Sequence, residues 1–144
     1  MEKKINGKIS QDEILAVAYF VVLSVFKRNI STRKTKTLRY SGLKSSDKAK
    51  CNDLIQKVLR FTVYLDPWIN KNKKGRLRIE LLCLARLALI DILIRNVRQE
   101  TVLKKYSDMA ESYERTKYSK DQLRYLIHLA YSQLEKKALN PRFL

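Results

Sequence analysis

The chain has 144 residues, with 31 Lys or Arg against 14 Asp or Glu, which gives a net charge of +17. Apolar residues make up 45% of it, so the chain can build a core and is not a disordered basic tail. A folded body with this charge is suited to a polyanionic partner, and RNA or DNA is the leading candidate.

The positive charge is concentrated in two short stretches. Residues 27–50 hold nine Lys or Arg and one acid, and residues 71–78 hold five Lys or Arg and no acid. Together they supply 13 of the 17 net charges. Both stretches fall between apolar segments, so we expect connections between helices that present cations to phosphates.

The scarcity of glycine and proline, together with the spacing of apolar residues, indicates helices. A capping box at Ser10–Glu13 begins a helix that runs to about Arg28 and is apolar on nearly every side. Its apolar run is too short for a bilayer, so we expect a core helix and not a membrane span. Residues 29–45 lack an apolar period and are broken by Gly42, which predicts a long basic connection.

A second helix is predicted over about 47–63, with a serine cap and one buried stripe at spacings of three and four. Asp66 followed by Pro67 is typical of an N-cap and the first position of a new helix. We therefore expect a short separate helix that carries Trp68, which we interpret as a core anchor.

Three further helices are predicted over 76–95, over 98–114 and from Ser119, which can form a capping box with Gln122. The helix over 76–95 is apolar almost all round, and we expect the others to wrap it. No strand pattern competes. The sequence therefore predicts an all-α bundle of five long helices and a short one, with residues 1–144 as a single domain.

This order of features resembles the NusB-like family, which includes the antitermination factor NusB and the N-terminal domain of RsmB-type rRNA cytosine methyltransferases. Residues 46–50 and 53–61, followed by Leu65-Asp66, resemble the methyltransferase N-domain. Residues 81–94, with Leu-Ala-Arg-Leu-Ala-Leu at their centre, are similar to the central helix of the family. The resemblance covers about residues 46–136 and implies a NusB-like helical bundle that binds RNA.

The resemblance implies an accessory RNA-binding domain and no catalysis. The methyltransferases carry a Rossmann-like domain and catalytic cysteines downstream, whereas Gly7, Gly42 and Gly75 are the only glycines here and form no nucleotide loop. The arginine-rich first turn by which NusB meets its partners reads Gln11-Asp12-Glu13 in this chain. We therefore expect any RNA surface to lie toward the two basic connections.

No catalytic, metal or cofactor site is predicted. Cys51 and Cys83 have no CxxC partner and fit small buried hydrophobic residues. His128, the only histidine, lies beside the apolar stripe of the last helix and fits a hydrogen-bonded core or edge residue. Asp91 and Arg95 are spaced to pair across one helical turn.

The candidate site residues are the cations of the two basic stretches and one interleaved aromatic residue. We expect the cations to contact phosphates and the aromatic ring to stack on an unpaired base, which RNA offers more often than duplex DNA. A solvated surface is the alternative interpretation. The residues are Lys27, Arg28, Arg33, Lys34, Lys36, Arg39 and Tyr40 in the first stretch, and Lys71, Lys73, Lys74, Arg76 and Arg78 in the second.

The sequence thus predicts a non-enzymatic RNA-binding protein of rRNA maturation, ribosome assembly or transcription antitermination, in the cytoplasm or an organelle matrix. Its expected partners are RNA, with rRNA first, and a ribosomal or transcription protein; no membrane partner is expected. The alternative is a protein-interaction or structural subunit of a ribosomal or transcription complex, whose basic connection orders only on binding. RNA binding by the isolated chain would favour the first interpretation.

Overall fold

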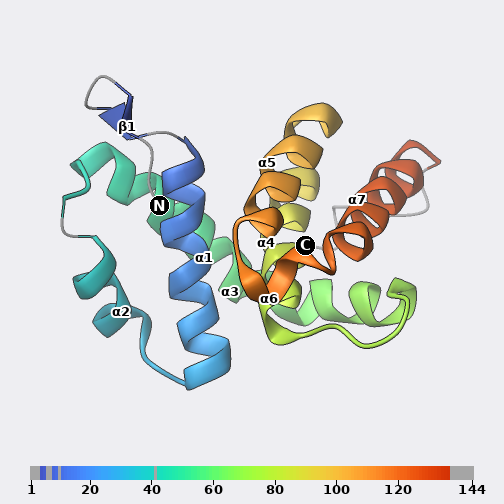
Figure 1. Ribbon diagram of the computed structural model, residues 1–144, viewed down its shortest axis with the longest axis horizontal. Coiled ribbons are helices and arrows are strands. Elements are labelled where there is room, and N and C mark those ends of the chain that lie inside the picture. Colours follow the sequence, from blue (N-terminus) through green and yellow to red (C-terminus); the bar gives the residue numbers. More distant parts are fainter. Residues whose placement is uncertain (1–3, 6–7, 10, 41, 137–144) are drawn as a thin grey trace. The chain divides into compact units, whose positions relative to one another are not determined.

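The computed structural model of this protein describes residues 4–5, 8–9, 11–40 and 42–136, with their side chains from residue 13 on except in 36–39. These ranges hold seven helices and one small hairpin (Figure 1). The helices are α1 (Gln11–Arg28), α2 (Thr32–Arg39), α3 (Ser45–Asn72), α4 (Ile79–Leu93), α5 (Gln99–Glu111), α6 (Glu114–Lys117) and α7 (Lys120–Glu135). The strands β1 (Lys4–Ile5) and β2 (Lys8–Ile9) pair antiparallel. The prediction of an all-α fold is confirmed. The hairpin, whose two strands have two residues each, was not predicted.

The five long helices lie where the sequence predicts them, but the short elements differ. The predicted connection over 29–45 contains helix α2, and the four-residue helix α6 follows α5 without having been predicted. The expected break before Trp68 is absent, because α3 runs unbroken from Ser45 to Asn72. The predicted capping residue Ser10 lies outside the described residues.

Helix α3 continues through Pro67 because tertiary contacts hold its backbone. Asp66, predicted as an N-cap, instead accepts two hydrogen bonds from the Arg86 guanidinium of α4, at 2.9 and 2.8 Å. One turn further on, Ile69 is fully buried. Proline inside a helix costs about 3 kcal/mol because it removes one N–H donor. The carbonyl group that loses this donor is that of Val63. Because Val63 is 69% exposed, a water molecule can donate to this carbonyl instead.

The chain divides into two compact units, Met1–Leu59 and Arg60–Leu144, and the boundary falls within α3. The prediction of one domain stays a prediction. In the first unit α1 packs against α2, and the Cys51 thiol at the start of α3 donates to the Ile14 carbonyl at 3.5 Å. The buried residues of this unit include Leu15, Ala18, Tyr19, Val21, Val22, Leu54, Ile55 and Val58. The first apolar run therefore forms core, as the sequence predicts.

In the second unit, α4 packs against α5, α6 and α7, and α5 packs against α7 (Figure 1). Nearly every residue of α4 is buried, which confirms the prediction that this helix is wrapped. Two of its neighbours, α5 and α7, each contribute one apolar stripe at spacings of three and four. The stripes are Val102, Tyr106, Met109 and Ala110 on α5, and Leu123, Leu126, Ile127 and Ala130 on α7.

A charged cluster between α4 and α5 is centred on Asp91, which is buried. The Asp91 carboxylate has no exposed surface and pairs with Arg95 at 3.1 Å, as predicted, and with Lys105 at 2.9 Å. It also accepts a hydrogen bond from the Tyr106 hydroxyl at 2.8 Å. Burial, followed by the Asp91 charge, raises the pKa of Tyr106 well above its usual value, so this hydroxyl remains a donor. The Asp91 carboxylate is therefore fully partnered within the fold.

Candidate nucleic-acid interface

The second basic stretch, residues 71–78, comprises the end of α3 and the connection to α4, and is called the 71–78 link below. Asn72 ends α3, and its side-chain amide donates to the Trp68 carbonyl at 2.8 Å. Gly75 has a φ of +78°, a left-handed conformation that glycine adopts without strain. Arg78 is extended and leads into α4. The link is therefore a short turn between the ends of two helices.

Helix α7 contacts this link through two side chains. The Gln122 Oε1 atom accepts a hydrogen bond from the Lys74 backbone amide at 2.9 Å, and Gln122 Nε2 donates to the Lys74 carbonyl. The Lys74 ammonium lies 4.3 Å from the centroid of the Tyr125 ring, a cation–π contact. Side chains three residues apart share a helix face, so Gln122 and Tyr125 contact both the backbone and the side chain of Lys74.

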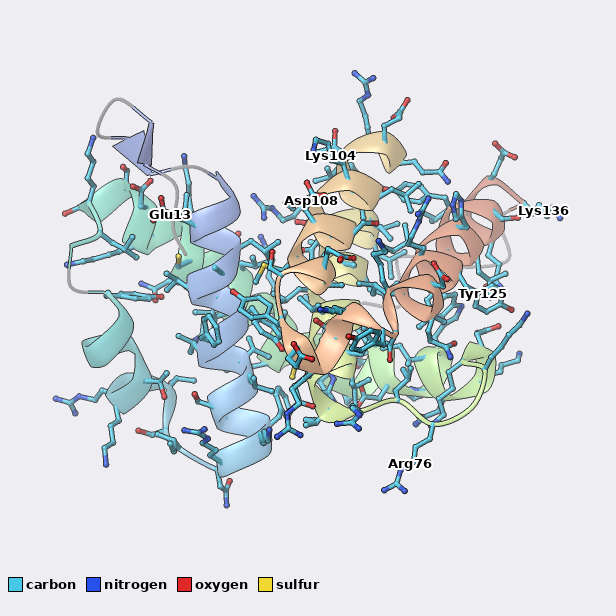
Figure 2. All side chains as sticks on the ribbon, in the orientation of Figure 1. Glu13, Arg76, Lys104, Asp108, Tyr125 and Lys136 are labelled. Carbon is cyan, nitrogen blue, oxygen red and sulfur yellow. The ribbon has the colours of Figure 1, made fainter. Side chains whose placement is uncertain are left out.

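The cations of the 71–78 link are not neutralised by any acid in the described part of the chain. Lys71, Lys74, Arg76 and Arg78 are exposed and Lys73 is half-buried, and none of the five forms an ion pair with a described acid. Figure 2 shows the Arg76 side chain extending away from the ribbon. Other surface lysines are paired at 2.9 Å: Lys57 with Asp53, Lys104 with Asp108 and Lys120 with Glu111. What distinguishes the link is its density of charge, with five cations and no acid in eight residues.

The first basic stretch begins at the end of α1. Lys27 and Arg28 are exposed in the last turn, where cations oppose the negative end of the helix dipole. Asn29 has a φ of +60° and ends the helix, and the amide of Ile30 donates to the carbonyl of Ser24 at 3.2 Å. This turn directs the chain into α2.

Ser31 is the N-cap of α2. Its hydroxyl accepts from the Lys34 amide at 3.2 Å, and its carbonyl accepts from the Thr35 hydroxyl at 3.1 Å. Thr35 is buried, whereas Arg33 and Lys34 are exposed. Helix α2 carries no acid, so its charge is wholly positive.

Three predicted residues of the first stretch remain, and the structure describes the side chain of one of them, Tyr40. The side chains of Lys36 and Arg39 lie outside the described residues. Tyr40 is 9% exposed, and its hydroxyl donates to Asn52 Oδ1 at 2.8 Å. Burial, followed by the neighbouring Cys51 thiol, raises the pKa of Tyr40. Tyr40 is therefore a core residue, because its ring is covered and not open to a base.

The two basic stretches belong to different compact units. Residues 27–40 lie within Met1–Leu59, and the 71–78 link lies within Arg60–Leu144. Each stretch therefore has to be evaluated as a separate surface. Of the two, the 71–78 link has the more complete set of described contacts.

Neither α7 residue that contacts the link was predicted as a site residue. Gln122 was expected to cap α7 with Ser119, but Ser119 makes no side-chain capping bond, and the Gln122 amide bonds to Lys74 instead. Tyr125 was not singled out. A signal was present, since Gln122 and Tyr125 are three residues apart and lie outside the apolar stripe of α7.

The described residues hold no other candidate site. Within them, no group of three His, Cys, Asp or Glu side chains could hold a metal ion. His128 is exposed, and its Nδ1 atom lies 3.1 Å from Gln99 Nε2, which satisfies the ring as predicted. None of the helices described has the length and apolar character needed to cross a bilayer.

We expect Cys51 and Cys83 to resist alkylation in the folded protein. Both are fully buried, and burial raises the pKa of Cys51 to about 11 and that of Cys83 to about 12. Because the thiolate is the nucleophile, iodoacetamide at about pH 8 should label them at least ~100-fold more slowly than in urea, and faster as the pH rises. Mass spectrometry measures both rates. Equal labelling rates with and without urea would contradict this burial.

Comparisons with protein-family models, with curated proteins and with solved structures return no match. The NusB-like resemblance therefore stays a prediction. What the fold and the site define is a class: an all-α protein that carries a short, anchored link of cations, none of which pairs with a described acid.

Proposed function

We propose that this protein binds RNA, with the 71–78 link as its principal phosphate-binding surface and the exposed cations of α1 and α2 as a second one. One observation carries the proposal. The link holds five cations and no acid in eight residues, and none of the five pairs with a described acid. Crowded like charges repel one another, and bound phosphates relieve this repulsion while releasing counterions.

Single-stranded RNA fits this surface better than duplex DNA. A duplex is read by a helix or a β-ribbon placed in the major groove, whereas the link is a turn closed by Gly75. Tyr125 lies beside the cations, and aromatic side chains suit unpaired bases. The NusB-like resemblance adds rRNA as the target, in rRNA maturation, ribosome assembly or antitermination. The chain would act in the cytoplasm or an organelle matrix, by binding and not by catalysis.

The test is the salt dependence of binding to a fluorescein-labelled, single-stranded rRNA fragment, followed by anisotropy. If roughly six to eight cations each meet one phosphate, the slope of log affinity against log salt should be about −4 to −6. This slope is to be measured between about 50 and 200 mM salt. A slope near zero, or no binding at the lowest salt, would overturn the proposal.

A second candidate function, docking to a protein, is supported by exposed apolar residues on α3. Val63 and Tyr64 are 69% and 53% exposed. The Tyr64 and Phe61 rings lie 6.4 Å apart, and the Arg60 guanidinium lies 5.2 Å from the Phe61 ring. Aromatic and Arg side chains are enriched in interfaces. RNA binding that requires a ribosomal or transcription protein would favour this function, and RNA binding by the chain alone favours the first.

A further inference from the structure

The Lys74 ammonium is held near the Tyr125 ring in a way that leaves it able to exchange partners. The backbone of Lys74 is fixed by both Gln122 hydrogen bonds, while its ammonium contacts the ring at 4.3 Å and no described acid. A cation over a partly exposed ring is held weakly, and a phosphate offers it a charge-assisted hydrogen bond. The ammonium can therefore move from ring to phosphate while the backbone stays anchored.

The Tyr125 side chain differs from several other tyrosines because its hydroxyl is not hydrogen-bonded to a described residue. The hydroxyls of Tyr40, Tyr106 and Tyr131 bond to Asn52, Asp91 and Val97. The Tyr125 hydroxyl makes no hydrogen bond to the described residues, and its half-buried ring lies outside the buried stripe of α7. Figure 2 places Tyr125 on α7. Its most specific described contact is the ammonium of Lys74.

We propose that Tyr125 is a base-stacking residue and that RNA binding replaces the Lys74–Tyr125 contact with two new ones, ammonium to phosphate and ring to base. This inference rests on the proposed RNA-binding function and narrows it. The ligand is an RNA that presents an unstacked base next to a phosphate at the 71–78 link. Duplex RNA supplies phosphates but no open base face, so it engages the cations without the ring.

The test compares two labelled RNAs, a single-stranded oligonucleotide of about 12 residues and a hairpin duplex of equal charge. Tyr125→Leu should lower affinity for the single strand roughly 5- to 150-fold, with duplex affinity and salt slope unchanged. Tyr125→Phe keeps the ring and should bind as the wild type. Lys74→Gln should make the slope about 0.7 less steep and keep the preference for the single strand.

Tyr118→Leu is the matched control, because Tyr118 is 80% exposed, lies 5.1 Å from the Lys117 ammonium and makes no described hydrogen bond or cation–π contact with a link residue. It should bind both RNAs as the wild type does. The stacking role would be overturned if Tyr125→Leu lowered the affinity for single strand and duplex equally, or lowered neither affinity. It would also be overturned if Tyr118→Leu lowered the affinity for the single strand as selectively as Tyr125→Leu. A wild type that binds neither RNA at low salt would instead overturn the RNA-binding function itself.

A second measurement keeps the inference testable if Tyr125→Leu fails to fold. Single-stranded RNA containing 5-iodouridine, irradiated with the wild-type protein, forms covalent bonds to the side chains that stack on its bases. Peptide mass spectrometry should find the crosslink on Tyr125. Crosslinks found exclusively at other residues would contradict the proposal.

Discussion

Changing Lys71, Lys73, Arg76 and Arg78 together to Gln should weaken binding to single-stranded RNA by a few hundred-fold at about 0.1 M salt. Each phosphate contact to a single strand releases about 0.7 counterion, worth roughly fivefold in affinity at this salt, and four contacts multiply. The slope of log affinity against log salt should become less steep by about 3. Anisotropy titrations at several salt concentrations measure both quantities. Lys74 is left unchanged because its ammonium contacts the Tyr125 ring, so its substitution would also change the surroundings of that ring.

A matched variant separates the link from net charge. Changing Lys57, Arg98, Lys104 and Lys120 to Gln also lowers the net charge by four, but these cations pair with acids at 2.9 to 3.8 Å. Exposed pairs contribute little to stability, so this variant should fold normally and bind within about threefold of the wild type. Equal weakening in the two quadruple variants would show that net charge alone governs binding, and the link would lose its assigned role.

Asp91→Ala should lower the free energy of unfolding by about 3–5 kcal/mol, the usual consequence of removing one partner of a buried ion pair. The variant leaves the Lys105 ammonium and the fully buried Tyr106 hydroxyl without their acceptor. Urea unfolding followed by tryptophan fluorescence measures the change. Trp68 is a suitable reporter because it is the only tryptophan, lies in the same compact unit and donates to Gln133 at 2.8 Å.

The control for this prediction is Asp108→Ala. Asp108 pairs with Lys104 at 2.9 Å at the same spacing of four residues, but the two side chains are 58% and 80% exposed. Its loss should change the free energy of unfolding by about 0–1 kcal/mol. If the Asp91 variant were no less stable than the Asp108 variant, burial of the cluster would not stabilise the unit.

The long helices could be predicted because their apolar residues repeat at a helical period. Helix α4 is apolar all round and is buried all round, and the stripe of α7 is buried as expected. Helix α2 has no such apolar period and was not predicted. Local hydrogen bonds of Ser31 and Thr35 support it instead. At Pro67 the local signal was misleading, because two hydrogen bonds between Asp66 and Arg86 outweigh the preference of proline for a helix start.

The candidate site was predictable in its charges and not in its geometry. The cations of residues 71–78 are visible in the sequence, but the bonds that anchor them join Lys74 to Gln122, 48 residues away. Which aromatic residue lies beside the cations also depends on the fold. Tyr40 lies among the cations in sequence and is buried, while Tyr125 lies far from them in sequence and contacts one of them.

The two Gln122 hydrogen bonds couple the opening of the 71–78 link to that of the first turn of α7. If the first turn of α7 detaches, the Lys74 backbone loses this anchor, and if the link opens, Gln122 loses its partner. A ligand that binds the closed link shifts this local equilibrium by mass action. RNA held at the link would therefore slow amide hydrogen exchange in the first turn of α7, on a helix that lies outside the link in sequence.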